Sequence, residues 1–277
     1  MQQKIEQFGK IRYWIEALPK VGKTTFSLEE VFAVFPNTPR QNLHNTLHRL
    51  VLSGKIKSVW KGFYAIVLYE FGIEGNIPHT EYIDQLMKYL GVDYYIALLS
   101  AAALYGASQQ QPQTFMVVCN KELRAKVKDG SKLEFAEKKI IPQKYVNQKV
   151  VNSGTINVST PELTAVDLLL YNKLAGGLLH VVTVLDELAE KIDFNKIEKD
   201  FFDNIPVAVI QRLGYIFDNV LNEHNIANVL LEKSKQAKII FRKIPLVAMG
   251  QEVSSKETYF VDPKWKIIIN YKIEADI

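Results

Sequence analysis

Polar side chains between residues 40 and 49 recur at a spacing that places them on one side of a helix. They are Arg40, Gln41, Asn45, His48 and Arg49, with His44 at the flank. Arginine, asparagine and glutamine can make paired hydrogen bonds to base edges in the major groove, so this set could read a DNA sequence. The alternative is an ordinary amphipathic helix whose polar side only meets water.

The other residues of this stretch predict the helix that would hold the polar set. Thr38 is a typical helix cap, and Pro39 suits the first helical position, where a missing N–H costs nothing. The apolar side chains repeat at helical spacing and would form one buried stripe: Leu43, Leu47, Leu50 and Val51. We therefore predict a helix that is capped by Thr38, starts at Pro39 and runs to Leu52.

The segment before this helix predicts a partner helix. Ser27 followed by Glu30 forms a capping box for a helix over 28–35, and Pro36 ends it. Two short helices joined by a tight turn, the second of which presents polar residues, make a helix-turn-helix.

The segment after it predicts a basic hairpin. The chain alternates through 55–60 and 63–66, with a turn at Lys61-Gly62. Its lysines would contact phosphates, which position a protein without reading sequence: Lys55, Lys57 and Lys61. We predict a winged helix-turn-helix DNA-binding domain over 1–70. A winged helix that contacts protein instead remains the main alternative.

The distribution of charge supports a polyanionic partner for this domain alone. Residues 1–68 contain ten lysines or arginines and four glutamates, which gives +6. Residues 69–277 contain 24 basic and 26 acidic residues, which gives −2. A basic module joined to a slightly acidic body is typical of a protein whose smaller part binds nucleic acid.

The composition limits the classes of protein to which this chain can belong. The 277 residues are 48% hydrophobic and 23% charged, a globular composition. No apolar run approaches the roughly 20 residues that span a bilayer, and the first ten residues lack a secretion signal. Cys119 is the only cysteine, so an internal disulfide is excluded. We expect a cytoplasmic protein with no membrane association.

Other motifs that could do chemistry are weak. Val21–Thr25 resembles a phosphate-binding loop, but Ala17 stands where that loop needs its first glycine. Glu137-Lys138-Lys139, with Asp129 upstream, resembles the acid–acid–lysine set of metal-dependent nucleases. Two histidines, His44 and His48, have zinc-ligand spacing but no evident third ligand. We expect no catalytic residue, no metal and no cofactor; the alternative is a metal-dependent nucleic-acid-processing enzyme targeted by the winged helix.

The rest of the chain predicts a second, larger domain. Glycines and a proline over 71–79 indicate a linker, and residues 80–277 contain strands, then helices, then terminal strands. One helix is expected over 93–105, and another is expected to be capped at Ser159-Thr160 and to start at Pro161. The fold class is α/β (α+β), with a mixed α/β body after the winged helix.

Three stretches carry a family resemblance: VDYYIALLSAAALYGASQQQPQTFMVV over 92–118, TINVSTPELTAVDLLLYNKLAGGL over 155–178 and VDPKWKIIIN over 261–270. With these stretches the chain resembles the AbiEi-like antitoxins of the abortive-infection (AbiE) type IV toxin–antitoxin systems. The resemblance covers nearly the whole chain, because those antitoxins also begin with a winged helix-turn-helix.

The resemblance implies a bacterial phage-defence antitoxin that represses its own operon by binding inverted repeats in double-stranded DNA. It also implies that the C-terminal domain, 80–277, counteracts a nucleotidyltransferase-like toxin without needing a stable complex with it. No catalytic residue follows from the resemblance. The residues 110–113 and 159–162 match family motifs, and we assign them only structural roles, a turn and a helix cap.

Overall fold

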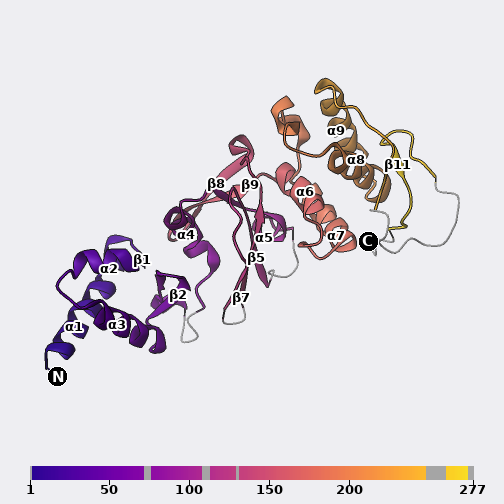
Figure 1. The fold of residues 1–277 in the computed structure, drawn as a ribbon. Helices are drawn as coiled ribbons and strands as arrows, with labels where there is room; N and C mark the ends of the chain where they lie inside the picture. Colours follow the sequence, from indigo (N-terminus) through magenta and orange to yellow (C-terminus); the bar gives the residue numbers. More distant parts are fainter. Residues whose placement is uncertain (1, 72–75, 108–112, 129–130, 248–259, 274–277) are drawn as a thin grey trace. The chain divides into compact units, whose positions relative to one another are not determined.

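The computed structural model describes residues 2–71, 76–107, 113–128, 131–247 and 260–273 (Figure 1). The chain divides into two compact units. The first comprises residues 1–93 and 148–157, and the second comprises 94–147 and 158–277.

The N-terminal unit begins with three helices and a small sheet. Its elements are α1 (Gln2–Ala17), the 3-10 turn η1 (Leu18–Val21), β1 (Thr25–Ser27), α2 (Leu28–Val34), α3 (Arg40–Leu52), β2 (Ile56–Trp60) and β3 (Phe63–Ile66). The strands form an antiparallel sheet in the order β1-β3-β2. The predicted hairpin with its turn at Lys61-Gly62 is confirmed.

Local chemistry explains where these helices start. The Ser27 hydroxyl accepts from the Glu30 amide, and the Glu30 carboxylate accepts from the Ser27 amide, so the predicted capping box is present. For α3 the predicted start was wrong by one residue: Pro39 is the N-cap, and Thr38 makes no capping bond. Extended backbone at Pro39 serves as the cap, and the helical backbone starts at Arg40.

The apolar stripe of α3 lies in the core of this unit. Leu43 and Leu47 are each 1% exposed, and they belong to one buried cluster with α1 and the sheet. The members that the other elements contribute include Ile11, Ile15, Val31, Phe26 and Ile56. Burying a leucine contributes about 1.5–3 kcal/mol, so this stripe fixes which side of α3 remains outside.

Helix α4 (Ile83–Leu90) completes the N-terminal unit. It follows the 3-10 turns η2 (Tyr69–Phe71) and η3 (His79–Glu81), and it ends at Gly91 in the left-handed conformation. The predicted linker, 71–79, placed this helix in the second domain, and residues 72–75 of that linker lie outside the described residues. By contacts α4 groups with the first unit, since Tyr89 packs on Phe63 of β3 with ring centroids 5.1 Å apart.

A mixed sheet organises the C-terminal unit. Its strands follow the order β6-β7-β5-β4-β9-β8. They are β4 (Tyr94–Ile96), β5 (Thr114–Cys119), β6 (Lys126–Lys128), β7 (Ser131–Glu137), β8 (Val146–Val151) and β9 (Gly154–Ser159). Strand β4 is antiparallel to β5 and parallel to β9, while β5 is parallel to β7. The tip of the β8–β9 hairpin, 148–157, groups with the N-terminal unit.

One helix expected from the sequence is divided. Residues 93–105 were predicted to be a single helix, but Tyr94–Ile96 form β4 and only α5 (Leu98–Leu104) is helical. Tyr95 and Ile96 are both 0% exposed in the middle of the sheet. Aromatic and β-branched residues suit a buried strand, and this tertiary environment overrides the helical pattern of the following alanines.

Helices follow the sheet along the chain. They are α6 (Pro161–Leu170), α7 (Leu178–Ala189), α8 (Val207–Tyr215) with the π-helical turn η7 (Ile216–Val220), and α9 (His224–Gln236). Three short 3-10 turns also occur: η4 (Gln143–Tyr145), η5 (Phe194–Lys196) and η6 (Lys199–Phe202). Helix α6 packs against α5, α7 and α8, and α5 packs on β5 (Figure 1).

The chain ends with a pair of two-residue parallel strands, β10 (Ile244–Pro245) and β11 (Ile267–Ile268). These are shorter than the strands expected over 239–247 and 265–271. The predicted mixed α/β fold class is confirmed. Among the described residues, no helix has the length and apolar character needed to cross a membrane.

Candidate nucleic-acid interface and a buried polar network

Helix α3 presents its predicted polar set to solvent. The exposed side chains are Arg40, Gln41, His44, Asn45, His48 and Arg49. Along this face, Gln41 Nε2 donates to Asn45 Oδ1 over 3.1 Å, which aligns two amide side chains one turn apart. The face therefore combines amide, imidazole and guanidinium groups without apolar interruption.

Helix α2 positions one edge of this face. The Arg40 guanidinium lies over the Phe32 ring, 4.9 Å from its centroid. The His44 ring meets the same phenyl ring edge-on, with centroids 5.9 Å apart. A cation over an aromatic face contributes about 0.5–1 kcal/mol at an exposed site, so this contact with Phe32 favours the observed position of the Arg40 guanidinium.

The predicted lysines of the hairpin lie at different positions along it. Lys55 precedes β2, Lys57 lies on β2 opposite Ala65, and Lys61 occupies the turn. Lys55 and Lys61 are exposed and Lys57 is half-buried. The Lys55 amide donates to the Leu50 carbonyl over 3.0 Å, which ties the start of the hairpin to the end of α3. The structure thus carries three lysines on a hairpin joined directly to α3.

Among the residues that the structure describes, the other motifs that could do chemistry do not assemble into sites. Lys23, from the phosphate-loop-like segment, pairs with Glu30 over 2.5 Å. Glu137 and Lys139 are exposed, but Lys138 between them is buried, so the acid–lysine set does not converge. Asp129 lies outside the described residues. Within the residues that are described, no three His, Cys, Asp or Glu side chains cluster as a metal site.

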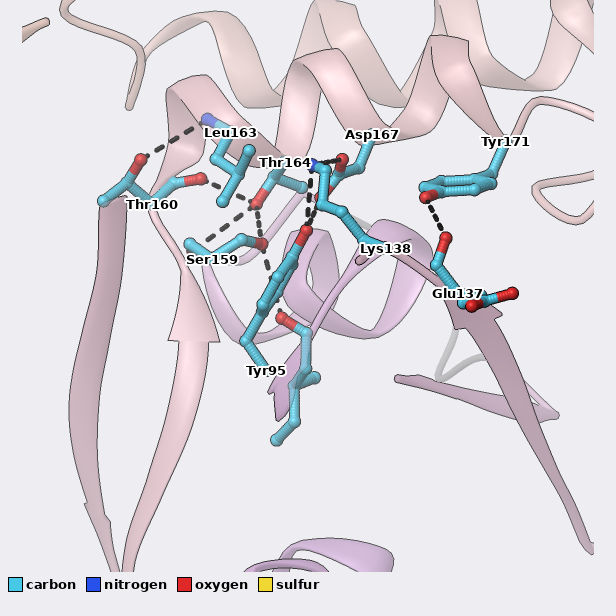
Figure 2. A network of polar contacts seen from close by, with 10 residues as sticks. Tyr95, Glu137, Lys138, Ser159, Thr160, Leu163, Thr164, Asp167 and Tyr171 are labelled. Carbon is cyan, nitrogen blue, oxygen red and sulfur yellow. Dashed lines mark hydrogen bonds and ion pairs between the residues drawn. The ribbon is translucent and has the colours of Figure 1, made fainter. Parts of the chain in front are cut away.

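An ion pair with a hydrogen-bonding tyrosine is enclosed in the C-terminal unit (Figure 2). Lys138, directly after β7, places its Nζ 2.8 Å from Asp167 Oδ1 on α6. Tyr95 on β4 donates its hydroxyl to Asp167 Oδ2 over 2.7 Å, and Lys138 Nζ lies 3.2 Å from that hydroxyl. The side chains of Lys138 and Asp167 are 8% and 0% exposed. The carboxylate therefore has a partner on each oxygen.

Burial sets the protonation behaviour of this network. Burial raises the pKa of Asp167 above its ordinary value, while the Lys138 ammonium and the Tyr95 hydroxyl oppose that rise. Burial, together with the Asp167 charge, raises the pKa of Tyr95 well above its ordinary value. Tyr95 thus keeps its proton at neutral pH and acts as a donor to Asp167.

Further polar contacts hold α6 against the sheet. The Tyr171 hydroxyl donates to the Glu137 carbonyl over 2.8 Å, just beside Lys138 (Figure 2). At the other end of α6, Thr160 Oγ1 accepts from the Leu163 amide over 3.3 Å, so the predicted cap is present. The Ser159 and Thr164 hydroxyls lie 2.6 Å apart. Residues 110–112 of the other family motif lie outside the described residues.

Sequence reasoning missed this network because its members come from three separate elements. One signal was present: Asp167 has only apolar neighbours on both sides in the run AVDLLL of α6. A buried carboxylate requires a charged or hydrogen-bonding partner, so that position predicted a partner but not which residue supplies it. Because its three buried side chains come from β4, from the residue after β7 and from α6, the network ties these elements together.

Comparison with known proteins concerns this same unit. Residues 95–219 match the family described as the AbiEi antitoxin C-terminal domain, a range that includes the whole Tyr95–Lys138–Asp167 network. The chain carries an AbiEi antitoxin domain. The resemblance to AbiEi-like antitoxins is therefore confirmed, and α6 of the AbiEi domain bears both the capped Thr160 start and the buried Asp167.

The fold also occurs in a solved structure. The crystal structure of the RV2827C protein from Mycobacterium tuberculosis is similar to this chain, with a TM-score of 0.62 and 12% sequence identity. The similarity covers 92% of this chain and 89% of that protein. At this identity it concerns the fold alone, and it extends beyond the AbiEi domain. No curated protein matches the sequence.

Proposed function

We propose that this chain is a type IV antitoxin that represses its own operon, with a winged helix-turn-helix DNA-binding domain at 1–70 and an antitoxin domain at 80–277. One observation supports the proposed DNA-binding function: the polar face of α3 is exposed, and the chain continues from α3 into a hairpin that bears lysines. The match of residues 95–219 to the AbiEi antitoxin domain supports the other half.

In the proposed complex, α3 enters the major groove of double-stranded operator DNA. Arg49, Gln41 and Asn45 contact base edges, while Arg40, His44 and His48 extend the same face. The hairpin lysines, Lys55, Lys57 and Lys61, meet phosphates. The net charge of +6 over residues 1–68 supplies the attraction, and an inverted repeat would accommodate two copies of the chain.

The antitoxin half is proposed to counteract a nucleotidyltransferase-like toxin in the bacterial cytoplasm as part of phage defence. It would act on the toxin or on the toxin's target without a stable complex. In this function the chain performs no catalytic step and needs no metal or cofactor. The exposed Glu137 and Lys139 flank a lysine that is already paired with Asp167, which gives the nuclease alternative no support.

Loss of an arginine from the DNA-binding face of α3 should weaken operator binding while the fold survives. We expect Arg49→Ala and Arg40→Ala each to raise the Kd for a duplex from the upstream region of this gene by about 5- to 100-fold. Binding should also fall steeply as salt rises, because phosphate contacts release counterions. Electrophoretic mobility shifts at several salt concentrations measure both effects.

Arg12→Ala is the matched control, since Arg12 is an exposed arginine of α1 that pairs with Glu16. Its Kd should stay close to that of the unaltered protein. Arg40 also stacks on Phe32, so a thermal melt of Arg40→Ala separates loss of contact from loss of packing. Unchanged Kd in both variants, or a binding constant indifferent to salt, would favour a winged helix that contacts protein.

Rescue of growth tests the antitoxin half. Co-expression with the neighbouring toxin gene should restore growth, and Arg49→Ala should rescue equally well because it alters only the DNA-binding face. Colony counts under separate inducible promoters measure this outcome. Failure of the unaltered chain to rescue would remove the antitoxin half, whereas failure of Arg49→Ala alone would show that the two functions are not separable.

A further inference from the structure

The turn of the hairpin rests against α4. The Tyr89 hydroxyl, in the last turn of α4, donates to the Lys61 carbonyl over 3.2 Å. Its ring lies 5.1 Å from the ring of Phe63, at an interplanar angle of 32°. The residue that holds the turn thus comes from outside the hairpin, 28 positions further along the chain.

Gly62 makes this approach possible. Its φ of +73° lies in the left-handed region that favours glycine, and a Cβ built there would lie 2.9 Å from the Tyr89 hydroxyl oxygen. The Gly62 carbonyl also accepts from the Leu28 amide, the first residue of α2, over 2.8 Å. The turn is therefore held on one side by α2 and on the other by Tyr89.

Helix α4 is itself fixed within the N-terminal unit. Ile83, Leu86 and Met87 are each 0% exposed. Gln85 Nε2 donates to the Ser153 carbonyl over 3.1 Å, in the hairpin tip that groups with this unit. Tyr89 consequently projects from a packed helix, and it can restrain the turn without first being ordered itself.

We propose that Tyr89 is a positioning residue for DNA binding, which fixes the hairpin turn so that Lys61 is held where it meets a phosphate. This inference rests on the proposed DNA-binding function. The hairpin already pairs with β1 through β3, so the freedom left to it is at the turn itself, and ordering that turn on binding would reduce affinity. The contacts of Tyr89 restrict the turn in the free protein, so less conformational entropy is lost when DNA binds.

The test uses the full chain with Tyr89→Ala and Tyr89→Phe, and Tyr69→Ala as the control because Tyr69 is a fully exposed tyrosine of the same unit. Tyr89→Ala should weaken operator binding by about tenfold, and Tyr89→Phe, which keeps the ring, by about threefold. Loss of one phosphate contact should also reduce the slope of log K against log salt by about 0.9. Tyr69→Ala should change neither quantity.

A double-mutant cycle separates positioning from a merely structural role. If Tyr89 acts through Lys61, adding Tyr89→Ala to Lys61→Ala should cause no further fall in the salt slope. Additive falls in the slope would overturn the inference. Thermal melts identify any variant that fails to fold, in which case Tyr89→Phe carries the comparison.

Hydrogen exchange without DNA keeps the inference separate from the proposed function. A peptide covering 56–66 should exchange faster in Tyr89→Ala than in the unaltered chain or in Tyr69→Ala. If Tyr89→Ala exchanges faster but the unaltered chain binds no operator, the proposed DNA-binding function is wrong. The anchoring of the turn by Tyr89 is then still supported. Equal exchange in all three proteins would overturn the inference, whatever the operator result.

Discussion

Replacing Lys138 with methionine is expected to lower the free energy of unfolding of the C-terminal unit by about 3–5 kcal/mol, because it leaves a buried carboxylate without its cation. Asp167 is 0% exposed, and Lys138 Nζ is 2.8 Å from its Oδ1. Tyr95 alone would then have to compensate a charge that water cannot reach. Chemical denaturation followed by circular dichroism measures the loss.

The neighbouring exposed lysine provides the control. Lys139→Met should change the free energy of unfolding by less than about 0.5 kcal/mol, since surface substitutions away from packed features are usually this small. The double variant Lys138→Met with Asp167→Leu should recover much of the loss, because it removes both buried charges. A Lys138→Met protein as stable as Lys139→Met would show that the enclosed ion pair does not stabilise this fold.

The loss should also depend on pH in a defined direction. Burial already raises the pKa of Asp167, and removing the Lys138 ammonium, which opposes that rise, raises it further. An acid whose folded pKa lies above its unfolded value is stabilising when protonated, and that contribution disappears as pH rises through the folded pKa. The deficit of Lys138→Met should therefore be smallest at acidic pH and largest at neutral pH.

A single methyl group at Gly214 is expected to cost about 3 kcal/mol, at the upper end of the usual range for overpacked cores. A Cβ there would lie 2.0–2.4 Å from three ring carbons of Trp265. The indole cannot move away easily: Trp265 is 0% exposed, its Nε1 donates to Asp218 Oδ2 over 2.9 Å, and the main-chain carbonyl of Trp265 accepts from Gln211 Nε2. Thermal and chemical unfolding of Gly214→Ala measure the effect.

Gly9→Ala is the matched control with the opposite expected sign. Gly9 lies in α1, and a Cβ there meets nothing within 4 Å. Alanine in an open helical position stabilises by up to about 1 kcal/mol relative to glycine. If Gly214→Ala unfolded at the same denaturant concentration as the unaltered protein, close packing of Trp265 on α8 would not limit stability.

The family stretch VDPKWKIIIN, over 261–270, has a structural explanation in these contacts. Asp262 Oδ1 accepts from the Trp265 amide, and Lys264 Nζ pairs with Asp218 Oδ2 over 2.7 Å. Trp265 itself covers Gly214. Residues far apart in the sequence thus fix this segment to α8 and to the π-helical turn that follows it.

Local patterns in the sequence were sufficient for α2, α3 and the β2–β3 hairpin of the N-terminal unit, but not for β1, whose residues were expected to form a loop. The repeat of Leu43 and Leu47 determined the buried side of α3, and the Ser27–Glu30 pair determined the start of α2. Alternation about Lys61-Gly62 determined the hairpin. Each depends on residues within a few positions of one another, where helical or strand geometry alone fixes which side chains share a face.

Tertiary contacts determined two features that the local patterns did not predict: a strand at Tyr94–Ile96 and the grouping of α4 with the N-terminal unit. Tyr94–Ile96 became a strand because β5 and β9 flank it, although the sequence favoured helix. Helix α4 groups with the N-terminal unit because of what Tyr89 and Gln85 contact, although Pro78 and the preceding glycines suggested a boundary.

The candidate sites divide in the same way. The polar face of α3 was predictable from the sequence, because its members lie within ten residues on one helix. From the sequence, Asp167 indicated only that a buried carboxylate needs a partner. The packing of β4, β7 and α6 shows that Lys138 and Tyr95 are the partners. The sequence by itself determined which residues share a local face; the tertiary structure decided which distant residues meet, because burial and long-range packing, not spacing, bring them together.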